Sequence, residues 1–467
     1  MRKLLVLAAP IIGTMVSRMA MGFVDFVMVS RLGTDATAAI SPSTILVFTF
    51  LVIGMGAATS IQTFAAQSLG RCRPRDAAAY AWQAVYIAAL FALAGWPITH
   101  GIDAFWTMVG HAPAVRAMEV AYCRIAFWCM GFSVVAFGLE GFFNGIQKPS
   151  VPLAASFVAL LFNIVANYGL IFGHFGLPAL GIQGAAYATV IAWGVRAFIV
   201  TTVFLSREFR RTYGTTDAWR CSLEKLKGIL RIGGPTSIQW VFDIGAWFVF
   251  LTFLMPEFGT AAMAASNITL QYMHFAFMPA LGIGIALNSL VGQAIGQGRP
   301  DLAVVRTRAC MVVNGLYMGL IGLIFFLARH PLMELMSVAP GGGASDPQVV
   351  RMGAGILIWA AVFQVSDAAS ITYMNAPRGA GDTRWPAIFI ILDCWGLFIL
   401  GGYLVSRLLP GLGVHGPWMM CTLYIILYGL ALWWRFHRGA WRKIDIFKKT
   451  AAPAPVAVGR QAQDPAI

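Results

Sequence analysis

Long apolar runs, separated by short polar and basic segments, recur along almost the whole chain. Each run has the length of about 20 residues with which an α-helix crosses a bilayer, where every backbone N–H and C=O must be paired within the segment. The runs are continuous, whereas strands of a membrane barrel alternate apolar and polar residues. Six predicted spans lie in the first half, at 5–30, 43–69, 77–98, 117–143, 152–172 and 183–205. Six more follow at 229–253, 267–295, 309–329, 352–374, 386–407 and 415–436. The pattern predicts an all-α integral membrane protein of about twelve transmembrane helices.

Composition supports a lipid environment. Of the 467 residues, 59% are hydrophobic and 11% charged, whereas a soluble domain carries about 25% charged residues. The first run lacks a small-residue cleavage site, so we expect a permanent span and not a removed signal peptide. The cysteines are odd in number and contain no C-x-x-C pair, which favours apolar packing over a disulfide framework or a metal site. We expect no cofactor.

The net charge of +14 raises the possibility of a nucleic-acid partner, but the positions of the charges argue against it. Every lysine falls on one side of the predicted map: Lys3, Lys148, Lys225, Lys227, Lys443, Lys448 and Lys449. The arginine-rich stretches at 71–75, 207–231, 299–308 and 435–442 fall on the same side. Because positive loops stay in the cytoplasm, we expect both termini there, in a bacterial inner membrane. The bilayer is then the expected partner, the chain a monomer, and nucleic acid is excluded.

The chain contains an internal repeat. An offset of 226 residues lays the segment 33–39 on 259–265 and pairs Gln67 and Gly70 with Gln293 and Gly296, without a gap. Each repeat has six spans, so both halves enter the membrane in the same direction, as in alternating-access transporters built from parallel repeats. An old duplication without mechanistic meaning is the alternative. We predict an N-terminal six-helix bundle at 1–205, a cytoplasmic linker at 206–228, a C-terminal six-helix bundle at 229–436 and a cytoplasmic, partly disordered tail at 437–467.

Four carboxylates lie well inside predicted spans: Asp25, Asp243, Asp367 and Asp393. An acidic residue at the bilayer centre costs at least about 2.5 to 3.5 kcal/mol on the insertion scale, so it marks a functional site by default. Such a group can carry a proton or hold a cation such as sodium. Hydrogen bonding to neighbouring hydroxyl and amide groups is the structural alternative, and it weighs most for Asp393.

Amide and aromatic side chains supply further candidates. Asn163 and Asn167 are four residues apart and share one helix face, where they can offer oxygens to a cation or bond across helices. A weaker set of candidates for a substrate cavity could bind organic cations through aromatic faces and thioethers, although packing is the more common role of such residues. This set is Trp240, Trp247, Tyr272, Met273, His274, Met278 and Gln364. For the lone His274 we favour packing over a proton relay.

From Pro10 to about Arg435 the chain resembles the multidrug and toxic compound extrusion (MATE) transporters, especially the NorM-like branch. The first-half motifs are Phe23-Val24-Asp25-x-x-Met28-Val29-Ser30-Arg31-Leu32-Gly33, Ala66-Gln67-Ser68-Leu69-Gly70, Asn163-Ile164-x-x-Asn167-Tyr168 and Gly184-Ala185-Ala186-x-Ala188-Thr189. The second-half motifs are Val291-Gly292-Gln293-Ala294-Ile295-Gly296, Phe363-Gln364-x-x-Asp367-Ala368 and Arg378-Gly379-x-x-Asp382-Thr383. The ordered set carries the resemblance more strongly than any single motif.

The resemblance implies an antiporter in which two six-helix bundles enclose a central cavity. It expels amphipathic, often cationic compounds while sodium or protons enter. By motif, Asp25 is the amino-lobe carboxylate, with Asn163, Asn167 and Thr189 as companions, and Asp367 is the carboxyl-lobe acid. Sodium is then expected at Asp25, Asn163 and Asn167, or at Asp243 and Asp367. Cation and drug would compete by favouring different states.

Two positions depart from the family pattern. Asp243 stands where these members usually have a glutamate, and Glu140 where a basic residue is expected near the end of the fourth span.

Three other functions remain as alternatives. A lipid-linked oligosaccharide flippase of the same superfamily would need a basic cavity, and Arg18, Arg124 and Arg196 are the only arginines away from the ends of the predicted spans. An integral-membrane enzyme would need a nucleophile, metal or cofactor motif, and we find none. A channel would conduct downhill without exchange.

Overall fold

The structure is a computed structural model, which describes residues 1–337 and 346–447. The first half contains α1 (Arg2–Ser30), α2 (Thr34–Gly70), α3 (Pro74–Val109), α4 (Pro113–Ala126), α5 (Cys129–Gly145), α6 (Ser150–Phe172), α7 (Ile182–Phe204) and the short α8 (Arg207–Tyr213). The second half begins with α9 (Leu223–Val249), the π-helix η1 (Phe250–Leu254), the 3₁₀ turn η2 (Met255–Phe258), α10 (Thr260–Gly296), α11 (Pro300–Leu327) and α12 (Arg329–Met336). It continues with α13 (Pro347–Ala380), α14 (Arg384–Asp393), the π-helix η3 (Cys394–Gly401), α15 (Gly402–Leu408), η4 (Pro410–Leu412), α16 (His415–His437) and η5 (Ala440–Lys443).

The predicted all-α membrane fold is confirmed. Among the described residues, 11 helices are long and apolar enough to cross a membrane, and the bent pair α4 and α5 makes up to 12. The span predicted at 117–143 corresponds to α4 and α5, and the chain bends by 47° between these two helices. There the N–H groups of Trp128 and Met130 bond to the carbonyls three residues earlier, Ile125 and Phe127. These hydrogen bonds form 3₁₀-type turns in place of α-helical turns, and the helix axis changes direction there.

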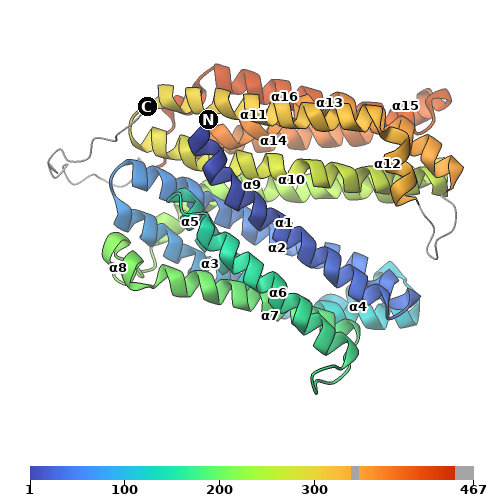
Figure 1. Ribbon diagram of the computed structural model, residues 1–467, viewed down its shortest axis with the longest axis horizontal. Helices are drawn as coiled ribbons and strands as arrows, with labels where there is room; N and C mark the ends of the chain where they lie inside the picture. Colours follow the sequence, from blue (N-terminus) through green and yellow to red (C-terminus); the bar gives the residue numbers. More distant parts are fainter. Residues whose placement is uncertain (338–345, 448–467) are drawn as a thin grey trace.

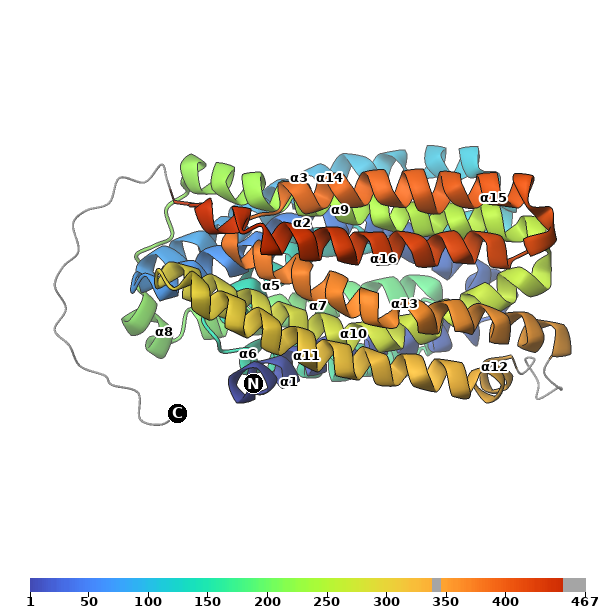
Figure 2. The same ribbon diagram turned by 90° about the horizontal axis from the view of Figure 1, so that it is seen from above.

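The two halves form two groups of helices that meet at one end of the molecule (Figure 1). Helices of the first half lie below those of the second half in this view, and the groups spread apart toward α4 and α12. In the view turned by 90°, the long helices share one general direction (Figure 2). We call the end where α1 begins and α16 ends the terminal end.

The helix boundaries follow the repeat. Both α2 and α10 begin after a glycine with positive φ, Gly33 at 119° and Gly259 at 93°, a region that only glycine adopts readily. They end at Gly70 and Gly296, so the two helices correspond over their whole length at the offset of 226. The next helices, α3 and α11, both begin with proline, which suits the first helical turn because its N–H has no partner there.

The halves touch through backbone at the terminal end. A Cβ atom added to Gly70 would lie 2.3 Å from the Gln293 carbonyl oxygen, and one added to Gly296 would lie 2.3 Å from that of Gln67. Glycine at both positions therefore lets α2 and α10 approach closely, as small residues do in membrane helix pairs. The contact is reciprocal, which is what a pseudo-two-fold axis produces.

Side-chain amides and hydroxyls reinforce this crossing. Gln62 of α2 donates to Ser289 Oγ at 2.8 Å and to the Ile285 carbonyl at 2.7 Å, both on α10. Thr63 and Gln67 donate to the carbonyls of residues 378 and 379 at the end of α13, each at 3.0 Å. Because these groups are buried, the bonds stabilise the closed terminal end and would leave unpaired polar atoms if the halves simply separated.

The first helix of each half packs with the opposite half. The apolar residues of α1 between Leu4 and Met15 belong to a core cluster with α10, α13 and α16. Conversely, Ile229 and Ile232 of α9 belong to the core of the first half. Figure 1 shows α1 starting beside the upper helices and crossing to the lower group. The boundaries predicted at 205 and 229 divide the chain, but the packing crosses them.

The predicted linker and tail contain folded parts. The linker holds α8, and residues 438–447 return to the bundle, where Phe447 contacts the rings of Phe64 and Tyr80 at 5.8 and 5.9 Å. Arg71 pairs with Asp445 at 2.9 Å. The remainder of the predicted tail lies outside the described residues.

We expect Gly70→Ala and Gly296→Ala each to lower the thermal unfolding midpoint of the purified protein. The added methyl overpacks the crossing, which typically costs about 1 to 3 kcal/mol. A thiol-reactive dye can follow unfolding, because five cysteines are buried: Cys123, Cys129, Cys310, Cys394 and Cys421. Gly194→Ala is the matched control, because a Cβ there meets nothing within 4 Å. Equal midpoints for all three variants would contradict a tight crossing.

Candidate functional site

In the first half, the carboxylate of Asp25 is held between three helices. It lies toward the far end of α1 and is 9% exposed. Its Oδ1 accepts a hydrogen bond from Asn167 Nδ2 of α6, and its Oδ2 accepts one from Thr189 Oγ1 of α7 at 3.0 Å. Asn167 also donates to Asn163 Oδ1 at 3.1 Å, one helical turn away. The structure therefore brings together all four residues that the sequence assigned to this lobe.

Not every polar atom of this group has a partner. Asn167 Oδ1 and Asn163 Nδ2 have no hydrogen-bond partner, and both side chains are fully buried. Tyr122 of α4, which was not predicted from the sequence, is buried and lies within electrostatic range of Asp25. A free amide oxygen beside a carboxylate and a hydroxyl gives hard oxygen donors of the kind that alkali and alkaline-earth cations prefer. The residues fit a cation or a carried proton.

In the second half, three carboxylates gather around α16. Asp243 of α9 and Asp367 of α13 interact electrostatically, and both lie within range of Cys421 and Tyr424 of α16. Asp393, at the end of α14, lies with Asp243 within range of Tyr428, one turn further along α16. The structure thus places the two predicted acids together and adds Asp393, whose Oδ2 is buried without a partner.

The helices around these acids contain both π-helical segments of the described chain. One, η1, follows α9, and the other, η3, starts directly after Asp393. Phe250 of η1 and Phe398 of η3 pack with ring centres 4.7 Å apart, and Trp418 of α16 lies 5.4 Å from Phe250. Widened helical turns of this kind often occur at functional sites, because they free backbone groups and redirect side chains. Here they lie beside the acidic cluster.

The predicted aromatic set is dispersed. Trp240 packs on the core of the first half, whereas Trp247, Tyr272 and Met273 pack on the core of the second half. The Tyr272 hydroxyl donates to the Leu332 carbonyl at 2.6 Å.

The other three members also lie apart. Met278 packs against the cluster that contains the start of α1, and Gln364 packs on Gly322 of α11. His274 is exposed on α10, so the structure does not show the packing role favoured for it. A shared cavity for these seven residues stays a prediction.

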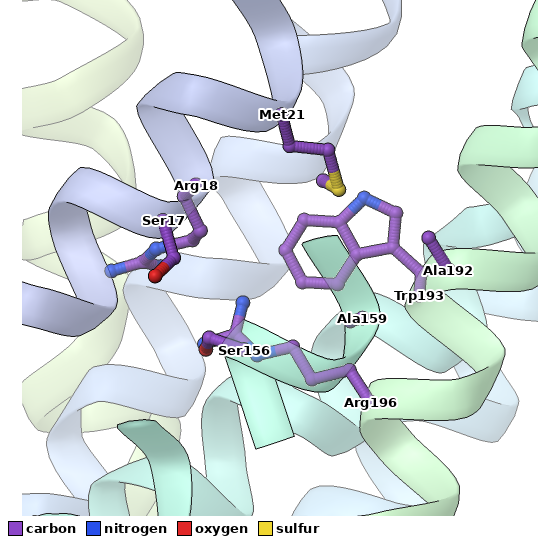
Figure 3. A pocket seen from close by; sticks show the side chains of 8 residues that line it. All are labelled: Ser17, Arg18, Met21, Ser156, Ala159, Ala192, Trp193 and Arg196. Atoms are coloured by element: carbon purple, nitrogen blue, oxygen red, sulfur yellow. The ribbon is translucent and has the colours of Figure 1, made fainter. Parts of the chain in front are cut away.

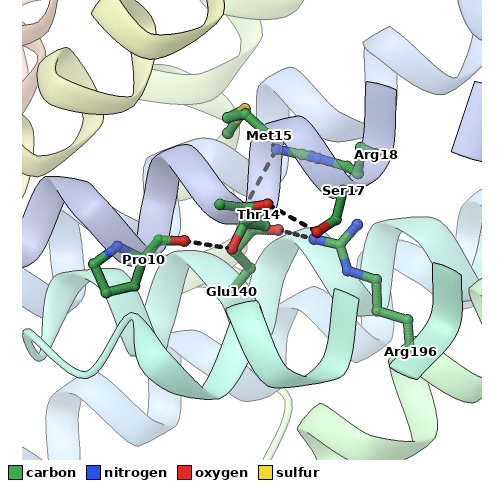
Figure 4. A network of polar contacts seen from close by, with 8 residues as sticks. Pro10, Thr14, Met15, Ser17, Arg18, Glu140 and Arg196 are labelled. Carbon is green, nitrogen blue, oxygen red and sulfur yellow. Dashed lines mark hydrogen bonds and ion pairs between the residues drawn. The ribbon is translucent and has the colours of Figure 1, made fainter. Parts of the chain in front are cut away.

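A second buried group of charges was not predicted from the sequence. Glu140 of α5 was interpreted only as a departure at a helix end, yet it is 5% exposed and pairs with Arg196 of α7 at 2.5 Å. Arg18 of α1 approaches the same carboxylate at 3.7 Å. Figure 4 shows both guanidinium groups reaching toward Glu140 from opposite sides. Arg124, the third arginine within the predicted spans, is exposed and lies outside this group.

A spacing in the sequence could have revealed this cluster. Arg18 and Asp25 are seven residues apart on α1, and Thr189 and Arg196 are seven apart on α7. Seven residues are about two helical turns, so each pair shares one face. The charged residues of the acid site and of the cluster therefore lie on the same interface at two depths.

The architecture defines a class of protein before any comparison. Two repeated helical bundles joined at one end, with charged groups buried in each, are the plan of membrane transporters that work by alternating access. Among the described residues, no group of three or more His, Cys, Asp or Glu side chains could hold a metal centre.

Comparisons with known proteins identify the family. The sequence model of the MatE family matches residues 10–169 and 244–404, so the chain belongs to the MatE family. A probable multidrug resistance protein NorM from Rhodopseudomonas palustris is 28% identical over 441 residues, covering 92% of this chain and 90% of the relative. A protein of the same name from Rhizobium meliloti is 29% identical over 440 residues, covering 94% and 93%.

A solved structure described as an outward-facing conformation of a multidrug resistance MATE family transporter of the MOP superfamily has the same fold. Its TM-score is 0.85 at 19% identity, with coverage of 95% of this chain and 96% of that chain. The resemblance inferred from the motifs is confirmed. The chain is a multi-pass membrane transporter and not an enzyme.

Replacing Thr189 by valine keeps the shape of the side chain but removes its hydrogen bond to Asp25. Because hydrogen bonds to charged groups contribute about 1.5 to 3 kcal/mol, we expect a lower thermal midpoint. Thr202→Val is the control on the same helix, since that exposed hydroxyl bonds only to the Phe198 carbonyl. If both variants unfold at the wild-type temperature, Thr189 does not stabilise the site.

Proposed function

We propose that the protein is a multidrug efflux antiporter of a bacterial inner membrane, exporting amphipathic organic cations in exchange for sodium ions or protons. The observation that carries the proposal is the presence of a buried carboxylate site in each half of a repeated bundle. Such groups are costly in a bilayer, and cation or proton exchange gives a reason to keep them. The names of the two NorM relatives support drug export.

The packing of α1 suggests how binding is transmitted. Asp25 ties the far part of this helix to α6 and α7, whereas Leu4 to Met15 pack in the core of the second half. A ligand that changes the hydrogen bonds of Asp25 therefore acts on a helix that belongs to both halves. Pro10 lies within the part of α1 that packs in the second half and removes one backbone hydrogen bond, which makes a bend there less costly.

Closure at the terminal end leaves the opposite end as the open side in this state. Switching requires the contacts around Gln62, Thr63 and Gln67 to break while others form at the far end. A ligand can drive that change only by the difference between its affinities for the two states. Export follows if the coupling ion favours one state and the drug the other.

A flippase for lipid-linked oligosaccharides is supported less. It would need a strongly basic cavity for a diphosphate, and the Arg18 and Arg196 guanidiniums share the Glu140 carboxylate. That leaves an excess of one positive charge. The three acids around α16 favour a cationic substrate.

The test is ethidium transport by everted membrane vesicles with sodium and pH gradients imposed separately. We expect transport to follow one gradient and to fall at least about tenfold in Asp25→Asn and Asp367→Asn, since each removes a binding charge. Asp103→Asn, at an exposed acid of α3, should behave as wild type. Properly inserted wild-type protein that ignores both gradients would contradict antiport.

The orientation of the chain in the membrane can be tested separately. The terminal end carries the basic loops, including Arg71, Arg73 and Lys148, so we expect it in the cytoplasm. Green fluorescent protein fused after residue 467 should fluoresce, and alkaline phosphatase at the same position should be inactive. The reverse pair of results would place the termini outside.

A further inference from the structure

The group formed by Arg18, Glu140 and Arg196 carries more positive than negative charge. Arg196 is 2% exposed and donates to Glu140 Oε2 through one nitrogen at 2.5 Å. Its Nε and Nη1 have no hydrogen-bond partner. Buried ion pairs are stable only when the remaining donors are satisfied. A guanidinium with two unpaired nitrogens, in a group with excess positive charge, is thus able to bind an anion.

A narrow hollow adjoins these free donors. It has a volume of about 10 Å³, close to the space that one water molecule needs, and is lined by Ser17, Arg18, Met21, Ser156, Ala159, Ala192, Trp193 and Arg196. Figure 3 shows Arg18 entering it from α1 and Arg196 from α7, with the ring of Trp193 on one side. Ser156 Oγ is also buried without a partner. The hollow has room for a group the size of one carboxylate oxygen and not for a whole drug molecule.

The hollow lies two turns from the acid site on all three helices. Arg18 and Asp25 are seven residues apart, as are Ser156 and Asn163 on α6, and Thr189 and Arg196 on α7. Seven residues span about 10 Å along a helix. In each case the member belonging to the hollow is nearer the terminal end. One interface therefore offers a carboxylate and an anion-binding group about 10 Å apart.

At the same level of the repeat, the second half carries acids where the first half has uncharged residues. The offset of 226 pairs Ser17 with Asp243. Helices α6 and α14 begin at Ser150 and Arg384, an offset of 234 that pairs Ala159 with Asp393.

The last helix pair completes the comparison. Gly181 and Gly413 both precede the last long helix of their half with positive φ, 57° and 52°, and their offset of 232 pairs Arg196 with Tyr428. The hollow and the carboxylates around α16 thus lie at the same level of the two repeats, with basic residues in one half and acids in the other.

We propose that the hollow between Arg18 and Arg196 is an anion subsite, which binds the carboxylate of a zwitterionic substrate while the cationic group of that substrate lies near Asp25. This assignment rests on the proposed export function, because it names the substrate class of the same site. A substrate carboxylate neutralises the excess charge, and hydrogen bonds from Arg196 and Ser156 hold it. The substrates are amphipathic zwitterions with charges on the order of 10 Å apart.

The experiment compares two dyes that differ only at a carboxyl group. Rhodamine 6G is a cationic ethyl ester, and rhodamine 19 is its zwitterionic free acid. Their Kd values are measured by fluorescence polarisation on full-length protein in phosphatidylcholine nanodiscs, without any gradient. The readout is the ratio of the ester's Kd to the acid's Kd, which cancels losses common to both dyes.

Arg18→Gln is the informative variant, because Arg196 and Glu140 remain as a neutral pair. We expect it to lower the Kd ratio by about tenfold, the loss of one charge-assisted contact. Arg18→Lys should retain most of the ratio, and Glu140→Gln, which adds positive charge, should raise it. Arg124→Gln is the matched control at an exposed arginine and should keep the wild-type ratio. The Kd values of a variant are compared only if its size-exclusion elution profile and thermal unfolding midpoint match those of the wild type.

A ratio that stays the same in Arg18→Gln and Glu140→Gln would overturn the subsite and leave a structural cluster. So would a wild-type ratio that collapses in nanodiscs containing phosphatidylglycerol, since the anion bound would then be a lipid headgroup. The outcome is independent of antiport. If ethidium export fails but the ratio responds, the subsite stands without the export function; if export works and the ratio does not respond, only the subsite falls.

Discussion

The close approach of α2 and α10 is the contact on which the rest of the molecule depends. Without a hydrophobic force between helices in lipid, association rests on close packing and on hydrogen bonds. Glycines at 70 and 296 let each helix touch the backbone of the other, and Gln62 and Gln67 pair buried polar atoms across the same crossing. Because the crossing lies at one end, the two bundles are held together there and diverge beyond it. An alternating-access transporter needs such a contact, since it must close one side of the membrane and later open that side while the other closes.

The first helix of each half packs with the opposite half, and this arrangement connects the carboxylate sites to the contact between the bundles. Helix α1 is fixed by its early residues to the second half and by Asp25 to the first, and α9 makes the reciprocal contacts. A change at either carboxylate site is therefore applied across the interface between the bundles and does not remain local. The reciprocity also explains why the repeat is preserved in helix lengths and turn glycines: a change in α2 has to match the partner it meets, α10.

Charge is where the two halves differ. The first half holds Asp25 among amides and a hydroxyl, with the Arg18–Glu140–Arg196 cluster two turns away, whereas the second half gathers Asp243, Asp367 and Asp393 around α16. Charged groups interact more strongly in a low-dielectric interior than in water, so each arrangement favours ligands of the opposite charge. Within the first half, an acid and a basic cluster two turns apart can recognise the two ends of one molecule, which two acids cannot do.

The sequence by itself determined the class of fold, because lipid requires continuous apolar helices and because the repeat and its glycines are visible as an offset. It also indicated the first acid site, since Asn163 and Asn167 share a face, Asp25 is the only acid in its predicted span, and the family resemblance joined these residues to Thr189. Only the tertiary structure decided that Glu140 pairs with Arg196 and that α1 packs with the opposite half. Helical periodicity fixes which residues share a face, whereas which faces meet depends on packing between segments more than a hundred residues apart.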